Sequence, residues 1–281
     1  MIKRTYLVTG TSSGIGRACV DELVRTGAHV WATVRSDADE KALLRDHPKA
    51  VRVLRVDLSD PDSVRAAGER VVADGPLDGL VNNAATTCPA PLEFVPLDSF
   101  RRQLEVNLTG QLAVAQAVLP ALRLAAAQGR SARIVEVGSI VGRIAGPIHG
   151  PYQTSKFALV GMTDSLRAEL APSGIKVVLI EPGAVATAGW GTMAAAFEEL
   201  EETLPAHARA QYAEQITVAR ESAAKTGRRG LPPHRVAQVI VKALSVRNPR
   251  PRYVVGLDAH LGAAVAKLPH RLVYRLTAAK A

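Results

Sequence analysis

An apolar run at residues 6–9 leads directly into Thr9-Gly10-Thr11-Ser12-Ser13-Gly14-Ile15-Gly16, which opens a helix-like segment at 14–26. Glycines are needed at such a strand-to-helix turn, because the backbone must turn tightly and approach a pyrophosphate, and the helix must pack closely on the strand. Free N–H groups and the helix dipole then favour an anion. The stretch therefore predicts a phosphate-binding turn, with contacts from Gly10, Ser12, Ser13, Gly14, Ile15 and Gly16.

The glycine spacing leaves the ligand of this turn open. It reads Gly-x-x-x-Gly-x-Gly rather than Gly-x-Gly-x-x-Gly, so the turn alone would also fit another nucleotide or a methyl donor. A second strand-like run ends in Val34-Arg35, where NAD-binding proteins usually carry an acid for the ribose hydroxyls. Because a guanidinium pairs with a 2′-phosphate, we expect NADP(H) rather than NAD(H). The alternative is that Arg35 is merely solvated.

Short β-branched runs alternate with amphipathic stretches along the chain, as in a parallel sheet covered by helices on both faces. The candidate strands are 6–9, 30–34, 51–56, 79–82, 133–137, 176–180 and 253–255, and the candidate helices are 14–26, 63–73, 97–127, 152–171 and 233–244. We therefore predict an α/β protein with one domain over residues 1–281, a doubly wound seven-stranded parallel Rossmann fold. Residues 188–230 break the alternation and are predicted to form a substrate lid.

The amino-acid composition limits the cellular compartment and the binding partners that we expect for the protein. With 47% apolar and 22% charged residues the chain is ordinary for a globular protein, and we expect neither a membrane span nor a metal site. Two cysteines and the lack of a secretory-type N-terminus favour the cytoplasm. The net charge of +9 comes from the C-terminal quarter, with 13 Lys/Arg and 2 Asp/Glu from Arg220 onward. This basic quarter fits an anionic partner, a membrane surface or a solvated face; its scattered cations argue against nucleic acid.

A second group of residues carries acid/base chemistry. Tyr152 and Lys156 are four residues apart in a helical segment, so they share one face, and an ammonium beside a phenol would lower the pKa of the phenol. Ser139 ends the fifth strand, where its hydroxyl could bond the substrate oxygen that Tyr152 protonates. Asn107 is a poor helix former inside a helix, and its side chain could hold a water in line with Lys156. We expect these side chains to meet in one crevice.

With these motifs in place, the chain resembles the short-chain dehydrogenase/reductase family over nearly its full length. The motifs are Thr9 to Gly16, Asp57, Asn82-Asn83-Ala84, Asn107, Ser139, Tyr152-x-x-x-Lys156 and Pro182-Gly183-x-x-x-Thr187. Ala85 and Gly138 depart from residues common in the family, without removing a reacting group. The sequence 31–35 and the long segment after Thr187 resemble the hydroxysteroid and retinol dehydrogenase-like branch.

The resemblance implies roles for individual residues. Asp57 would border the adenine, Asn82 would steady the central strands, and Lys156 would also bind the nicotinamide ribose. The Pro-Gly segment and Thr187 would contact the carboxamide end. The remaining cofactor contacts that we expect are Leu58, Asn83, Ala84, Tyr152, Pro182, Gly183 and Val185. Family members usually pair through the helices that hold Asn107 and Tyr152, so a homodimer or homotetramer is expected.

These observations predict hydride transfer between NADP(H) and a carbonyl or secondary alcohol, with Tyr152 as the acid/base. The alternatives are a non-catalytic NADP-binding sensor on the same fold, and a sugar-nucleotide epimerase or dehydratase, whose glycine turn and C-terminal domain usually differ. A bulky lipophilic substrate would suit a mostly apolar set of side chains, each of which could equally be core. The set is Ile140, Val141, Ile144, His149, Trp190, Met193 and Phe197.

Overall fold

The computed structural model describes residues 3–187 and 189–278, and it contains one sheet of seven parallel strands in the order β3-β2-β1-β4-β5-β6-β7. The strands are β1 (Thr5–Val8), β2 (His29–Val34), β3 (Val51–Arg55), β4 (Gly79–Asn82), β5 (Arg133–Val137), β6 (Lys176–Pro182) and β7 (Arg252–Val255). The order reverses between β1 and β4, which creates the crevice where ligands of doubly wound sheets bind. The predicted fold class is confirmed.

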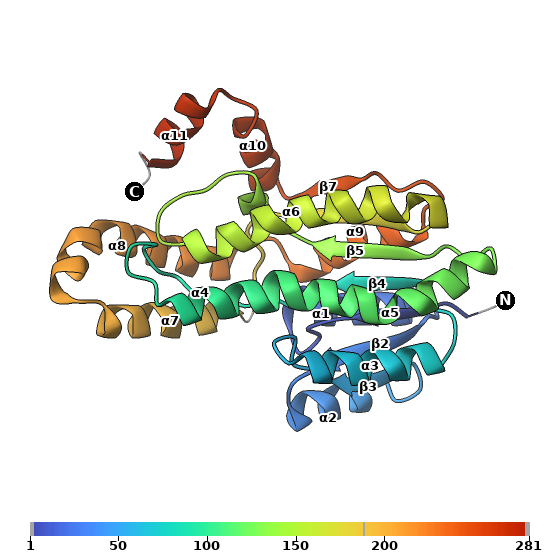
Figure 1. Cartoon of the computed structure of the whole chain (residues 1–281). Coiled ribbons are helices and arrows are strands. Elements are labelled where there is room, and N and C mark those ends of the chain that lie inside the picture. The colour runs from blue at the N-terminus through green and yellow to red at the C-terminus, as the bar shows by residue number, and fades with distance from the viewer. Residues whose placement is uncertain (1–2, 188, 279–281) are drawn as a thin grey trace.

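Helices cover both faces of the sheet (Figure 1). They are α1 (Gly14–Arg25), α2 (Asp37–Asp46), α3 (Pro61–Ala73), α4 (Leu97–Leu104), α5 (Gly110–Ala127), α6 (Gly150–Leu170), α7 (Gly189–Thr203), α8 (Ala206–Arg229), α9 (Pro233–Ser245), α10 (Leu257–Val265) and α11 (His270–Ala278). Apolar side chains of α1 and α9 form one core cluster with the strands, and those of α3 and α5 form another on the opposite face. The sheet is thereby held rigid between two layers.

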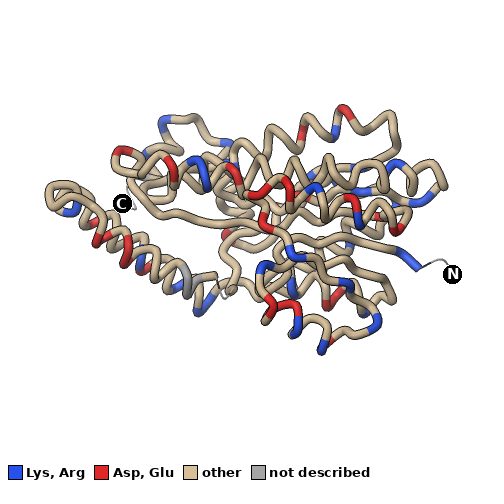
Figure 2. The backbone as a smooth tube through the Cα atoms, turned by 60° about the horizontal axis from the view of Figure 1, so that its bottom comes forward, with Lys and Arg blue, Asp and Glu red and all other residues tan. Residues whose placement is uncertain are grey.

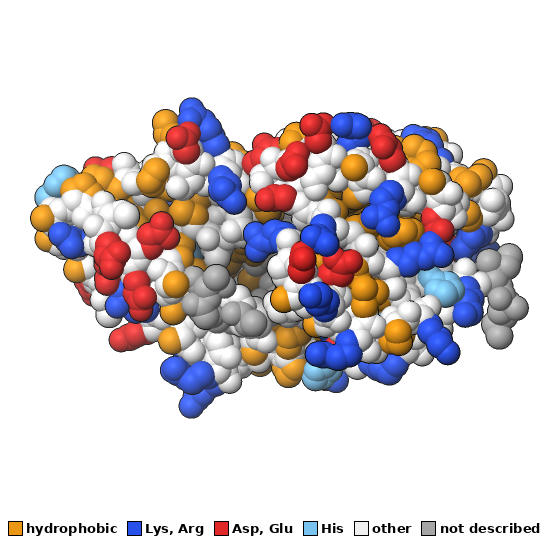
Figure 3. Space-filling model, turned by 90° about the horizontal axis from the view of Figure 1, so that it is seen from below, with side chains coloured by type: hydrophobic (Ala, Val, Ile, Leu, Met, Phe, Trp, Pro, Cys, Tyr) orange, Lys and Arg blue, Asp and Glu red, His pale blue; other side chains and the backbone are white. Residues whose placement is uncertain are grey.

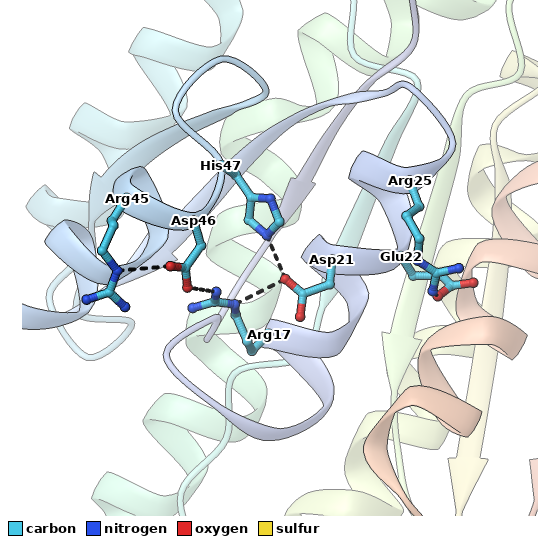
Figure 4. Close-up of polar contacts among 7 residues, drawn as sticks. All are labelled: Arg17, Asp21, Glu22, Arg25, Arg45, Asp46 and His47. Atoms are coloured by element: carbon cyan, nitrogen blue, oxygen red, sulfur yellow. Dashed lines mark hydrogen bonds and ion pairs between the residues drawn. The ribbon is translucent and has the colours of Figure 1, made fainter.

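A polar network fixes α1 to the end of α2 (Figure 4). Arg17 donates through Nε to Asp21 at 3.2 Å and also pairs with Asp46, while His47 Nε2 lies 2.7 Å from Asp21 Oδ1. The network matters for the ligand site because Arg17 directly follows the glycine turn. Its guanidinium is engaged on the outer surface of α1, away from the turn.

The predicted lid forms a helical hairpin made of α7 and α8. Its apolar side chains, including Phe197 and Ile216, pack into a third cluster together with Ala90 and Ile148 from loops outside the lid. Both ends of the hairpin meet at one place, since Ala186 N donates to Leu231 O at 3.0 Å. The charged residues of α7 are all acidic, whereas α8 carries both acidic and basic residues (Figure 2).

The run Leu97–Ala127 is long and apolar enough to pass a length-and-composition test for a membrane span, with a mean hydropathy of 1.3. In the structure this run is divided between α4 and α5. Its buried residues, such as Val114, Val118 and Leu122, pack against the sheet and α3. We therefore interpret it as a core helix.

Candidate functional site

A cavity of about 440 Å³ lies at the carboxyl ends of the strands, where the strand order reverses. Seen from below, the molecule is hollowed between the lid helices and the part that holds the first strands, and basic side chains lie at the rim (Figure 3). Of the cofactor contacts expected from sequence, all but Gly16 line this cavity: Gly10, Ser12, Ser13, Gly14, Ile15, Arg35, Asp57, Leu58, Asn83, Ala84, Tyr152, Lys156, Pro182, Gly183, Val185 and Thr187.

The glycine turn is shaped for close backbone approach. Gly10 and Gly14 have φ values of +67° and +60°, in the left-handed region that favours glycine. Gly16 serves packing instead, because a Cβ there would lie 2.1 Å from Gly10 O. Ser13, the N-cap of α1, makes no side-chain cap, and the first turn of α1 holds no acid. The helix N-terminus thus keeps donors and positive potential for an anion, which fits a dinucleotide pyrophosphate.

Side chains that directly follow β1 and β4 hold the turn in place. Asn83 Nδ2 donates to Thr9 O at 3.0 Å and to Gly10 O at 3.1 Å. Thr9 Oγ1 in turn accepts the backbone N–H groups of Asn83 and Ala84, at 2.9 and 3.1 Å. These bonds join the ends of β1 and β4, so the turn is positioned by the sheet itself.

Two arginines and one acid lie at the end of the cavity nearest β2 and β3. Arg35 follows β2, and Arg102 reaches the same cavity from α4. Asp57 accepts from Ser59 Oγ at 2.6 Å, and this hydrogen bond is the main cause that lowers the pKa of the carboxyl, with smaller contributions from Arg102 and Arg35. Sequence reasoning missed Arg102, since nothing in the pattern of α4 indicates that it would join Arg35.

Ser139, Tyr152 and Lys156 meet at the opposite part of the cavity. Tyr152 and Lys156 lie on α6, and the Lys156 ammonium is 5.6 Å from the Tyr152 ring centroid. Lys156 is 1% exposed, and its Nζ donates to Val137 O at 2.9 Å. The backbone of β5 therefore fixes the lysine, while Ser139, the second residue after that strand, hydrogen-bonds the Tyr152 side chain.

The electrostatics of this trio correct one expectation. Burial raises the pKa of Tyr152 to about 12, and the hydrogen bond with Ser139 opposes this rise. Burial also lowers the pKa of Lys156 to about 8, opposed by the carboxylate of Glu136. The expected lowering of the Tyr152 pKa by the ammonium is not found, because desolvation dominates and only the Ser139 hydrogen bond opposes it; the phenol therefore keeps its proton at neutral pH.

Asn107 joins a loop to α6. It lies in a π-helical turn, η1 (Glu105–Thr109), and is fully buried. Its Oδ1 accepts from Thr86 N at 2.8 Å, and its Nδ2 donates to Thr86 O at 2.9 Å and Ser155 Oγ at 3.1 Å. Both amide hydrogens are therefore committed to protein atoms, and Asn107 does not line the cavity. These bonds brace the Thr86 loop against α6, and the expected water in line with Lys156 stays a prediction.

Glu136 is an unexpected buried acid beside this site. Its side chain is 0% exposed, and Oε1 accepts from Asn82 Nδ2 at 2.9 Å. Neither Glu136 Oε2 nor Asn82 Oδ1 has a hydrogen-bond partner among the residues that the structure describes. Burial raises the pKa of Glu136 to about 7, with Asn82 and Lys156 opposing the rise. Asn82 thus supports the central strands, as expected, through β5 and through Gln111 O on α5.

The side chains expected to face a substrate are distributed differently. Met193 and Phe197 are buried in the third cluster, and the His149 ring packs edge-on against Phe197, with centroids 6.1 Å apart. The side chain of Trp190 lies outside the described residues. None of the other six lines the cavity as described, so the core alternative applies to Met193 and Phe197. Ile140, in turn, is covered by α10, because a Cβ on Gly262 would lie 2.7 Å from Ile140 Cγ1.

Two polar clamps hold the loop that follows β6. Glu181 is fully buried and accepts two bonds from Arg143, Nε at 2.7 Å and Nη2 at 2.5 Å. Asp258 on α10 accepts from Ala184 N at 2.6 Å and fills the space that a Cβ on Gly183 would occupy. The segment after Ser139, the Pro182-Gly183 segment and α10 are therefore one connected unit.

Comparisons with known proteins agree with this architecture. Residues 4–197 match the family model described as short chain dehydrogenase. A solved structure of a short-chain dehydrogenase from Streptomyces avermitilis superposes with a TM-score of 0.77 at 27% identity, covering 95% of this chain and 94% of that one. A nucleotide-type turn at the switch point of a doubly wound sheet, with Ser139, Tyr152 and Lys156 beyond it, is the arrangement of nicotinamide-dependent oxidoreductases. The chain belongs to the short-chain dehydrogenase/reductase family.

Two curated relatives span nearly the whole chain. The NADPH-dependent 3-dehydrocapnine reductase of Ornithobacterium rhinotracheale is 31% identical over 97% of this chain and 95% of its own length. The 3-amino-tetrahydro-pyrrolizinone reductase of Xenorhabdus hominickii is 34% identical over 92% of this chain and 89% of its own length. Both relatives are named as reductases, which agrees with an oxidoreductase activity for this family member.

Proposed function

We propose that the protein is an NADP(H)-dependent reductase of a lipophilic ketone, acting reversibly on the corresponding secondary alcohol. The observation that carries the proposal is the convergence of Ser139, Tyr152 and Lys156 at one part of a cavity whose other part holds the glycine turn and two arginines. The NADPH-dependent relative supports the cofactor. The lipophilic substrate class rests on the sequence alone, because the apolar residues of the third cluster do not line the cavity.

The residues present fit this cofactor. The turn from Gly10 to Ile15 would hold the pyrophosphate, Asp57 and Leu58 would border the adenine, and Arg35 with Arg102 would face a 2′-phosphate. Lys156 and Thr187 would hold the nicotinamide end. When bound, the reduced nicotinamide supplies the hydride.

The chain's own groups supply the proton and orient the carbonyl. Ser139 would donate a hydrogen bond to the carbonyl oxygen, beside the Tyr152 hydroxyl. Because the pKa of Tyr152 is about 12, the phenol holds a proton at neutral pH and can act as general acid as charge develops on that oxygen. The Lys156 ammonium lies near the ring and would stabilise the phenolate left behind.

Tyr152→Phe tests the proposal directly. The change deletes the acid and little volume, so NADPH affinity should hold while turnover falls about 100-fold or more. Turnover is followed by NADPH absorbance with a panel of ketones, and affinity by NADPH fluorescence. Phe157→Tyr, an exposed change on the same helix, is the matched control and should retain turnover. A Tyr152→Phe protein with more than about a tenth of wild-type turnover would remove the acid role.

Cofactor choice is tested at the end of β2. Val34→Asp with Arg35→Gln adds an acceptor for ribose hydroxyls, repels a 2′-phosphate and removes one of its partners. Wild type should prefer NADPH by roughly 10-fold or more, and the double variant should prefer NADH. The measurement is kcat/KM for both cofactors at fixed salt, because screening weakens the phosphate contact. A wild type that uses NADH equally well would contradict the NADP assignment.

A further inference from the structure

The last two helices and the turn between them present large apolar side chains to solvent. They are Leu257, Leu261, Leu268, Leu272, Tyr274 and Leu276, which are 41–79% exposed. Every described residue of α11 is at least partly exposed, and none of its apolar side chains belongs to the three core clusters. Single exposed leucines are normal on a protein surface, but a run of this length along consecutive helices indicates a binding surface. We call these side chains, with Lys267, Arg271 and Arg275, the C-terminal surface.

Charge is distributed along this surface in a regular way. Leu272 and Leu276 are four residues apart on α11, and each directly follows an arginine, Arg271 or Arg275. The leucines therefore form one row along the helix and the cations the neighbouring row. After Asp258 the chain contains no Asp or Glu. A basic amphipathic helix with an uncovered apolar row is typical of segments that lie on membranes.

The C-terminal surface is attached to the substrate side of the site. Gly262 of α10 packs directly against Ile140, in the segment that follows Ser139. On the other side Asp258 holds the backbone N–H of Ala184, next to the Pro182-Gly183 segment that lines the cavity. In Figure 1, α10 and α11 stand apart from the layers that enclose the sheet. A flat partner can therefore reach them without disturbing the core.

We propose that the C-terminal surface binds an anionic phospholipid membrane, with its leucines at the level of the headgroups and its cations paired with lipid phosphates and carboxylates. Lipophilic substrate would then enter from the bilayer, and this second part rests on the proposed function. A second copy of the chain is a poorer occupant. In a two-fold interface the surface would meet itself, so Arg271 and Arg275 would face like charges with no acid in the patch.

Sedimentation of the full-length protein with vesicles tests the binding. Vesicles of phosphatidylcholine with about 30% phosphatidylglycerol should bind wild type, whereas pure phosphatidylcholine should bind it roughly tenfold or more weakly. Arg271→Gln with Leu272→Ser should weaken binding to the anionic vesicles by about tenfold or more. The matched control is Lys41→Gln with Leu44→Ser on α2, which also changes one exposed cation and one exposed leucine. It should bind as wild type does.

Three results would overturn the proposal. They are no binding to anionic vesicles, equal loss in the test and control variants, and a dimer in solution that Arg271→Gln with Leu272→Ser dissociates. A dimer that this variant dissociates would show that the C-terminal surface binds a second copy of the chain. Failure of the proposed function is seen separately, since vesicle binding needs no turnover. If wild type reduces a short, water-soluble ketone but binds no vesicle, the membrane proposal fails and the proposed reductase function stands. If wild type binds vesicles but reduces no ketone, the proposed reductase function fails and the membrane proposal stands.

Discussion

Glu136→Gln should make the protein more stable at alkaline pH and leave its stability at acidic pH nearly unchanged. The folded-state pKa of Glu136 is raised from 4.5 to about 7, so the folded protein holds this proton more tightly than the unfolded chain. Stability is therefore lost as pH rises from 4.5 to 7. At 1.36 kcal/mol per pKa unit, the cost at about pH 8 is about 3 kcal/mol. The glutamine does not ionise, so it avoids this cost.

The hydrogen-bonding groups around Glu136 favour the substitution. The new amide can still accept from Asn82 Nδ2 and can donate to Asn82 Oδ1, which lacks a partner among the described residues. Thermal unfolding of both proteins at about pH 5 and about pH 8 measures the effect, and about 3 kcal/mol corresponds to a midpoint shift of roughly 6–12 °C. Glu169→Gln, an exposed change on α6, is the control. Equal shifts at both pH values would refute the reasoning.

Three further predictions concern the cofactor, the lid and the clamp behind the site. Arg102→Gln should raise the KM for NADPH by about fivefold, with little change for NADH, if it shares the 2′-phosphate with Arg35; equal changes for both cofactors would contradict this. Binding of NADP and substrate should slow amide hydrogen exchange across residues 188–230, and equal exchange with and without ligands would remove the lid function. Arg143→Met should leave Glu181 buried without its cation and cost about 3 kcal/mol, measured by urea unfolding; an unchanged urea midpoint would contradict the clamp.

The sheet and its main helices could be predicted because the spacing of their apolar residues matches the faces that they bury. The predicted helices 14–26 and 233–244 correspond within two residues to α1 and α9, whose apolar rows pack into the core. The helix α2 was not predicted, since only Leu43 of its ten residues is buried and its pattern is mostly charged. The π-helical turn that divides 97–127 was also missed, because the widened turn leaves the apolar periodicity on either side intact.

Most of the expected cofactor contacts line the cavity, but the pKa values of its groups could not be predicted. The glycine turn and the Tyr152–Lys156 pair carry local spacing rules, whereas the pKa of Tyr152 depends on burial by elements far apart in sequence. The same applies to Arg102, which joins Arg35 only because α4 crosses the end of the cavity. The hydrogen-bond partners of Asn107 depend on the loop at Thr86 and on α6, and neither is indicated by its neighbours in the chain.

The α7–α8 hairpin, the proposed lid, begins and ends at the same point of the fold. Ala184 O accepts from Leu231 N at 2.8 Å, and Leu231 O accepts from Ala186 N at 3.0 Å. The intervening hairpin can therefore change in length or sequence at little entropic cost, since the loop closure is already made by the backbone outside it. Under the lid proposal, substrate range can evolve by exchange of this hairpin alone, while the reacting groups and the cofactor turn stay as they are.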